Sequence, residues 1–105
     1  MTEIEREQFH NDMLTIYHEA KKFGYVATRF KQMVDNKGGY ETAKQLIAKQ
    51  DNSTTGFTEL WMHDKLNLSV EAHVAEKWSH LFTEEEAAEC RRRLAEVGYT
   101  PKQPN

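Results

Sequence analysis

Residues 2–24 read TEIEREQFHNDMLTIYHEAKKFG, and this stretch decides the fold class. Thr2 and Glu5 have the spacing of a capping box, in which each side chain satisfies the other residue's free backbone N–H. Apolar residues then recur at spacings of four, three, four and three, the period of one helix face. They are Phe9, Met13, Ile16, Ala20 and Phe23. Because Gly24 can end a helix in the left-handed conformation, the stretch predicts one long amphipathic helix.

Further helices are predicted after residue 24, since no proline occurs before Pro101 and glycines divide the chain into helix-sized pieces. The apolar spacing predicts helices over about 28–36, after 38–39, from 57, and over 83–97, where Thr83 and Glu86 form a second capping box. Residues 66–74 alternate as a strand does. No other such segment exists to pair with them, so a short helix from about Ser69 to Glu76 is predicted.

These elements predict an all-α fold, a compact bundle of five to six short helices around a single core. One helical domain is expected over residues 1–99, with a polar loop at 50–55 and a flexible C-terminal tail at 100–105. Beyond the first helix, the expected core residues are Phe30, Met33, Val34, Tyr40, Ala43, Leu46, Ile47, Ala87, Cys90, Leu94 and Val97.

Composition excludes several classes of protein. The chain has 105 residues, of which 38% are hydrophobic, and this is too apolar for an intrinsically disordered protein. Its formal charge of −3 shows no overall basic excess, and its one cysteine allows no internal disulfide. The charged N-terminus lacks the apolar run of a secretory signal, so a cytoplasmic, non-membrane protein is predicted.

Enzymatic motifs are incomplete. His63-Asp64 resembles part of a metal phosphohydrolase site, but no aspartate follows Asp64 to complete the ligands. Lys22 stands where a zinc-protease motif beginning at His18 would need its second histidine. Cys90 lies on the inward stripe of the last helix, where a thiol behaves as a small hydrophobe. We therefore predict a non-enzymatic protein with no catalytic residue, metal ligand or cofactor.

Protein binding is the class that remains, and its candidate contact residues are Trp61, Met62, His63 and Trp78. Trp61 and Met62 are adjacent, and neighbouring helix positions point about 100° apart, so burial of one leaves the other near the surface. Trp78 is expected in a loop between two helices. Because Trp and Met are frequent anchors at interfaces, these residues predict a protein-interaction or regulatory module; filling the core is the equally weighted alternative.

Nucleic-acid binding is the alternative function, because charge is distributed unevenly. Residues 21–49 carry seven basic and two acidic side chains, a net +5, which leaves −8 for the rest. Aromatic residues interleave with these cations, as on surfaces that contact phosphates and stack bases. The candidate contact residues are Lys21, Lys22, Arg29, Lys31, Lys37 and Lys44. A solvated basic face beside core aromatics explains the same pattern.

Several motifs resemble a small bacterial all-helical domain family without an assigned activity. They include Gly56-Phe57-Thr58-x-Leu60-Trp61, then Leu66-x-Leu68-Ser69-Val70-Glu71, and finally Leu81-Phe82-Thr83-x-x-Glu86. The resemblance covers about residues 25–99. Domains of this kind occur alone and attached to larger proteins, some of them similar to nucleases or defence proteins. The resemblance implies an accessory or regulatory module and supplies no catalytic residue.

Overall fold

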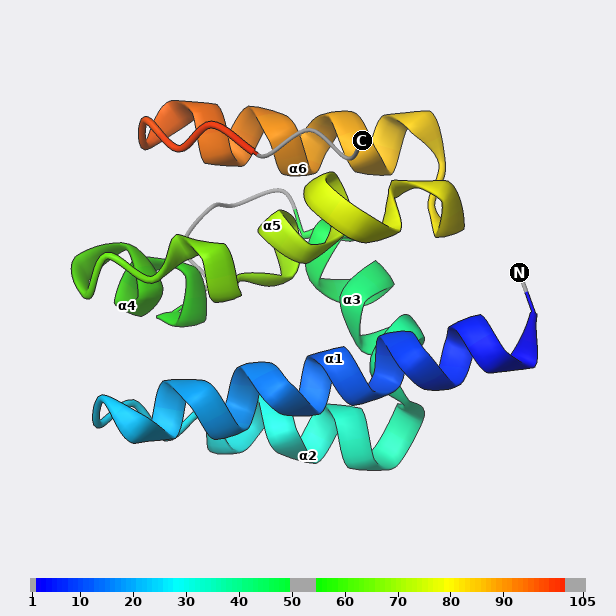
Figure 1. Cartoon of the computed structure of the whole chain (residues 1–105), viewed down its shortest axis with the longest axis horizontal. Helices are drawn as coiled ribbons and strands as arrows, with labels where there is room; N and C mark the ends of the chain where they lie inside the picture. Colours follow the sequence, from blue (N-terminus) through cyan, green and yellow to red (C-terminus); the bar gives the residue numbers. More distant parts are fainter. Residues whose placement is uncertain (1, 50–54, 102–105) are drawn as a thin grey trace. The chain divides into compact units, whose positions relative to one another are not determined.

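The computed structural model describes residues 2–49 and 55–101 (Figure 1). These residues form six α-helices, two 3-10 helices, one π-helix and no strand, so the predicted all-α class is confirmed. The α-helices are α1 (Glu3–Lys22), α2 (Thr28–Lys37), α3 (Gly39–Ala48), α4 (Thr55–Met62), α5 (Val70–His73) and α6 (Glu84–Glu96). The shorter elements are η1 (Leu66–Leu68), the π-helix η2 (Val74–Trp78) and η3 (Ser79–Leu81). Within the described residues, no helix has the length and apolar character needed to cross a membrane.

The helices divide between two compact units, Met1–Leu46 and Ile47–Asn105. The single core and the domain over residues 1–99 stay predictions. Most of the predicted loop at 50–55 and most of the predicted tail at 100–105 lie outside the described residues.

In the first unit, α1 and α2 lie side by side and run in opposite directions (Figure 1). The capping box of Thr2 and Glu5 is present at the start of α1. The predicted stripe is buried as far as Ala20, whereas Phe23, at the C-terminal cap, is half-buried. In α2 the prediction is partly wrong, because Val34 is buried but Phe30 and Met33 are half-buried. In a short helix, the apolar residues at the centre of the buried face are covered more completely than those at its edges.

The junction of α2 and α3 depends on two glycines. Gly38 has φ +88°, a conformation that L side chains rarely adopt, and it lets the chain turn between the helices. Gly39 then lies directly against α1. Its N–H donates to Nδ1 of His10 at 3.0 Å, which caps the start of α3. A Cβ at Gly39 would lie 2.7 Å from Cα of His10, so only glycine permits this approach.

We expect Gly39→Ala to destabilise the protein by about 1–3 kcal/mol, because the clash is with backbone and no rotamer relieves it. Urea unfolding measures the change. Exposed Gln32 on α2 provides the control, and Gln32→Ala should change stability by less than about 0.5 kcal/mol. Alanine in a helix normally gains about 0.5–1 kcal/mol over glycine, so a stabilised Gly39→Ala protein would contradict the close approach.

In the second unit, the predicted helix over 69–76 divides into two kinds of helix. Ser69 caps α5 as predicted, since its hydroxyl accepts from the N–H of Ala72 at 3.0 Å. The coil then widens into η2 instead of ending at Glu76. After η3 the chain reverses, and α6 returns along α5 and η2 (Figure 1). The capping box of Thr83 and Glu86 begins α6, as predicted.

A buried arginine joins α5 and α6 of this unit to the unit's first residues, Ile47 and Lys49. Arg93 of α6 is 3% exposed. Its guanidinium donates to the Glu89 carboxylate at 2.7 Å and to the Glu71 carboxylate of α5 at 3.2 Å. It also donates to the carbonyl oxygen of Ile47 at 2.8 Å and to that of Lys49, at the C-terminal end of α3. The guanidinium therefore caps α3 as well as pairing with two carboxylates.

The same cluster shifts the protonation equilibria around it. Burial raises the pKa of the Glu71 carboxyl above its usual range, although Arg93 works in the opposite direction. Glu89 is more accessible, and hydrogen bonds from Arg92 and then Arg93 lower its pKa to about 2. Glu89 pairs with both arginines, at the helix spacings of three and four that favour ion pairs.

We expect Arg93→Met to destabilise the protein by about 3–5 kcal/mol, because it leaves the buried Glu71 carboxylate without its countercharge. The matched control is Arg92→Met. Arg92 pairs with Glu89 and Glu96 in solvent, so its loss should cost less than about 1 kcal/mol. Urea unfolding measures the free energy of unfolding of both variants. Equal decreases in this free energy would show that the burial of Arg93 has no energetic consequence.

Candidate functional site

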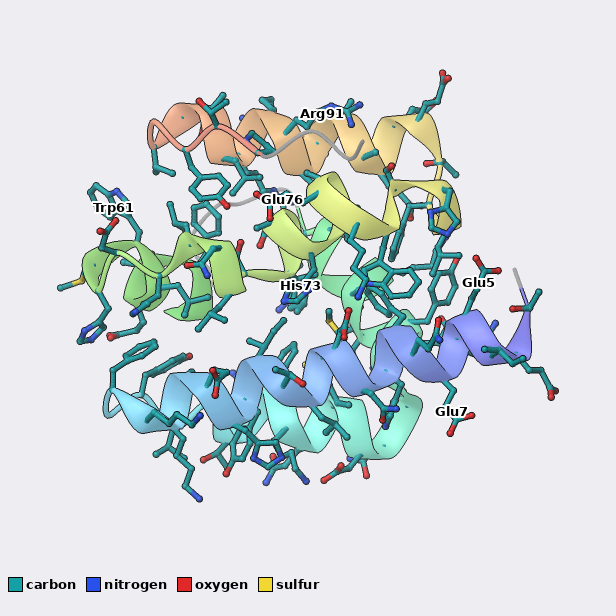
Figure 2. The ribbon with its side chains drawn as sticks, viewed as in Figure 1. Glu5, Glu7, Trp61, His73, Glu76 and Arg91 are labelled. Atoms are coloured by element: carbon teal, nitrogen blue, oxygen red, sulfur yellow. The ribbon has the colours of Figure 1, made fainter. Side chains whose placement is uncertain are left out.

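The end of α4 exposes two large apolar side chains. Trp61 is 51% exposed and Met62 is 69% exposed, whereas Phe57 and Leu60 of the same helix are buried. Figure 2 shows the Trp61 indole standing away from α4. Neither member of the adjacent pair is buried, because Leu60 takes the inward position. We call Trp61 and Met62 the α4 patch.

A tight turn holds the patch in place. The N–H of Lys65 donates to the carbonyl oxygen of Leu60 at 2.7 Å, and that of Asp64 donates to Trp61 at 3.1 Å. This is a Schellman motif, with Asp64 in the left-handed position at φ +57°. His63, a predicted contact residue, is exposed in this turn, and its Nε2 lies 3.8 Å from a carboxylate oxygen of Glu59. His63 therefore lies directly beside the α4 patch in the chain.

Trp78 differs from its prediction. It ends the π-helix η2 instead of lying in a loop, and it is 4% exposed. The Nζ of Lys77 lies 5.1 Å from the centroid of its ring, and the His80 ring lies 5.9 Å away. A π-helix carries an extra residue per turn, which re-aims the side chains that follow. Trp78 is therefore a core residue, and the two tryptophans have opposite roles.

The basic residues of the first unit are largely engaged with neighbours. Lys22 pairs with Glu19 and Lys31 with Asp35, each at 2.6 Å. Lys37 donates to Gln45, and Nζ of Lys44 lies 5.4 Å from the Tyr40 ring centroid. Most of these cations therefore have local partners.

Two of the basic residues converge on one aromatic ring. The Nζ atoms of Lys21 and Lys31 lie 5.8 and 5.9 Å from the centroid of the Tyr17 ring. Arg29 is exposed, and no described residue forms a hydrogen bond or ion pair with it. The half-buried Tyr17 ring and its two lysines combine an aromatic face with positive charge, a combination typical of sites for single-stranded nucleic acids.

Cys90 and the His63-Asp64 pair are the groups that catalysis or metal binding would use. Cys90 is buried, and that burial raises the pKa of its thiol to about 12, so the thiolate that chemistry would need is strongly disfavoured. Within residues 2–49 and 55–101, no three His, Cys, Asp or Glu side chains are arranged to hold a metal ion.

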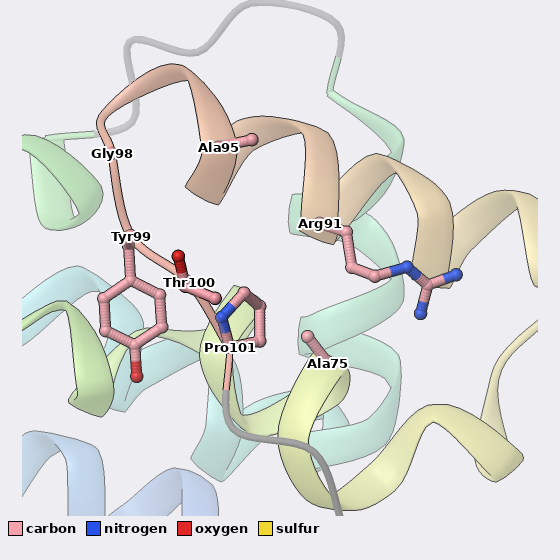
Figure 3. Close-up of a pocket in the computed structure, with 7 residues that line it drawn as sticks. All are labelled: Ala75, Arg91, Ala95, Gly98, Tyr99, Thr100 and Pro101. Atoms are coloured by element: carbon pink, nitrogen blue, oxygen red, sulfur yellow. The ribbon is translucent and has the colours of Figure 1, made fainter.

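A pocket of about 400 Å³ lies in the second unit, at the C-terminal end of α6 (Figure 3). Arg91 and Ala95 of α6 line one side, and Ala75 of η2 lines another. Residues 98–101 close it by turning back from the helix, with Gly98 at φ +78°. These small side chains leave the space between the helices open.

Tyr99 holds this returning segment in position. Its N–H donates to the carbonyl oxygen of Leu94 at 2.9 Å, and its hydroxyl donates to a Glu76 carboxylate oxygen at 2.6 Å. Burial and this hydrogen bond raise the pKa of Tyr99 to about 12, so the hydroxyl stays a donor across the physiological range. Sequence reasoning missed the pocket, because its walls come from segments about 20 residues apart.

Comparison of the chain with protein-family models, with curated proteins and with solved structures gave no match, so the case for a function comes from the residues themselves.

Proposed function

We propose that the protein is a non-enzymatic interaction module that binds a protein partner through the α4 patch. The observation that carries the proposal is the joint exposure of Trp61 and Met62 on a helix whose other large apolar residues are buried. Water contact with both side chains is unfavourable by roughly 25 cal/mol per Å² of apolar surface, and a partner that covers them recovers this free energy.

The chemistry of the patch suits a protein surface. Tryptophan is among the residues that contribute most to binding when an interface buries them, and methionine adapts its shape to different apolar neighbours. Around them, Glu59, His63, Asp64 and Lys65 provide a polar rim of mixed charge. An apolar centre inside a polar rim is the usual organisation of a protein–protein interface. We therefore expect the partner to offer an apolar groove.

A photo-crosslinking amino acid in place of Met62 tests this proposal in the cells that express the protein. We expect one discrete adduct that excess unlabelled protein suppresses and that excess Trp61→Ala protein does not. The matched control places the same crosslinker at Glu85, which is exposed on α6 of the same unit. Identical adducts from positions 62 and 85, or none from position 62, would refute binding through the α4 patch.

Nucleic-acid binding through the first unit is the second candidate function. It is favoured by Lys21 and Lys31, whose Nζ atoms lie beside the half-buried Tyr17 ring, and by the exposed Arg29. The ion pairs of Lys22 and Lys31 with carboxylates weaken this candidate, because those charges are already partly neutralised.

Fluorescence anisotropy with single-stranded and duplex oligonucleotides, at about 50 and 200 mM salt, tests the second candidate. If it holds, affinity falls steeply with salt, and Arg29→Glu with Lys31→Glu abolishes binding. The control pair, Lys65→Glu with Arg91→Glu, changes the net charge equally in the other unit and should retain binding. An absence of binding at the lower salt concentration eliminates this function.

A further inference from the structure

The three consecutive arginines of α6 have three different environments. Arg93 is buried among carboxylates and carbonyl oxygens, and Arg92 pairs with Glu89 and Glu96 at the surface. Arg91 is exposed, and no described residue forms a hydrogen bond or ion pair with it. Residues three and four positions from it on the helix are Ala87, Ala88, Leu94 and Ala95, so α6 itself offers no carboxylate.

The nearby acidic groups are already engaged. Glu89 and Glu71 bond to Arg93, Glu96 pairs with Arg92, and Glu76 accepts from the Tyr99 hydroxyl. The positive charge of Arg91 is therefore available to a molecule from solution. Its stem lines the pocket of the second unit, and its guanidinium lies at the edge away from Tyr99 (Figure 3).

The rest of the lining limits what the pocket can bind. Ala75, Ala95 and the Pro101 ring provide a small apolar wall, and Thr100 adds one hydroxyl. The volume of about 400 Å³ is within the range of small-molecule sites, about 300–1,000 Å³. One guanidinium can pair with a carboxylate through two parallel hydrogen bonds. Among the described lining residues a dianion would find no second cation, and the acidic balance of residues 47–105 opposes its binding.

We propose that this pocket binds a small organic monocarboxylate, with the carboxylate on Arg91 and the apolar part against Ala75, Ala95 and Pro101. The site is separate from the α4 patch. The proposal does not depend on the proposed protein partner, since neither Trp61 nor Met62 lines the pocket.

Benzoate is a suitable probe, because it combines one carboxylate with a compact apolar ring. We expect benzoate to shift the backbone amide NMR signals of Ala75, Ala95, Tyr99 and Thr100 in a saturable titration. Benzamide, which has the same shape without the charge, and inorganic phosphate, which has charge without an apolar part, should bind at least tenfold more weakly. Equal binding of phosphate would indicate anion adsorption only and would overturn the proposal.

Three variants of the full chain complete the test. Arg91→Gln should weaken benzoate binding at least tenfold, and Ala95→Leu should abolish it by filling the pocket without altering charge. Arg92→Gln is the matched control, because it removes the same charge one residue away from a guanidinium that is already paired. If benzoate produces no saturable shifts, or if Arg91→Gln and Arg92→Gln have equal effects, the pocket does not bind carboxylates.

Discussion

The buried guanidinium of Arg93 is the interaction on which the second unit depends. A cation that loses its water must be given hydrogen-bond acceptors in return, because an unpaired buried charge is strongly unfavourable. Here Glu71, Glu89 and the carbonyl oxygens of Ile47 and Lys49 meet that requirement. The acceptors come from α5, from α6 and from the first residues of the unit, so satisfying one side chain holds these three segments together. Buried groups of this kind act more through the arrangement they impose than through net stabilisation.

The orientation of α6 follows from this constraint. Once position 93 faces inward, positions 92 and 91 must point about 100° and 200° away from it, in directions set by the helical period. Arg92 then lies beside its carboxylate neighbours in solvent, and the stem of Arg91 lines the pocket that residues 98–101 also line. The burial of Arg93 therefore leaves Arg91 without a partner among the described residues, at the edge of the pocket. The candidate ligand site is a consequence of how the core is built.

The two tryptophans of the second unit differ in how far their side chains are buried. They belong to the same unit, yet Trp78 is enclosed at the end of the π-helix and Trp61 stands in solvent at the end of α4. Packing in the core is sufficient to explain the presence of a tryptophan at position 78. No described residue of the second unit, by contrast, covers the exposed half of the Trp61 side chain. Of the two tryptophans, only Trp61 is therefore accessible to the proposed protein partner.

Local features were predictable from the sequence, because residues a few positions apart encode them. Both capping boxes, the buried stripe of α1, the Ser69 cap and the pairing of Glu89 with Arg92 and Arg93 all follow from spacings of three or four. The tertiary structure alone decided which arginine and which tryptophan are buried. Arg93 meets acceptors 22 and 46 residues away, and the pocket brings Ala75 beside residues 98–101. The spacing of apolar residues within one helix does not predict which of these side chains is buried, because burial depends on which other segments pack against the helix.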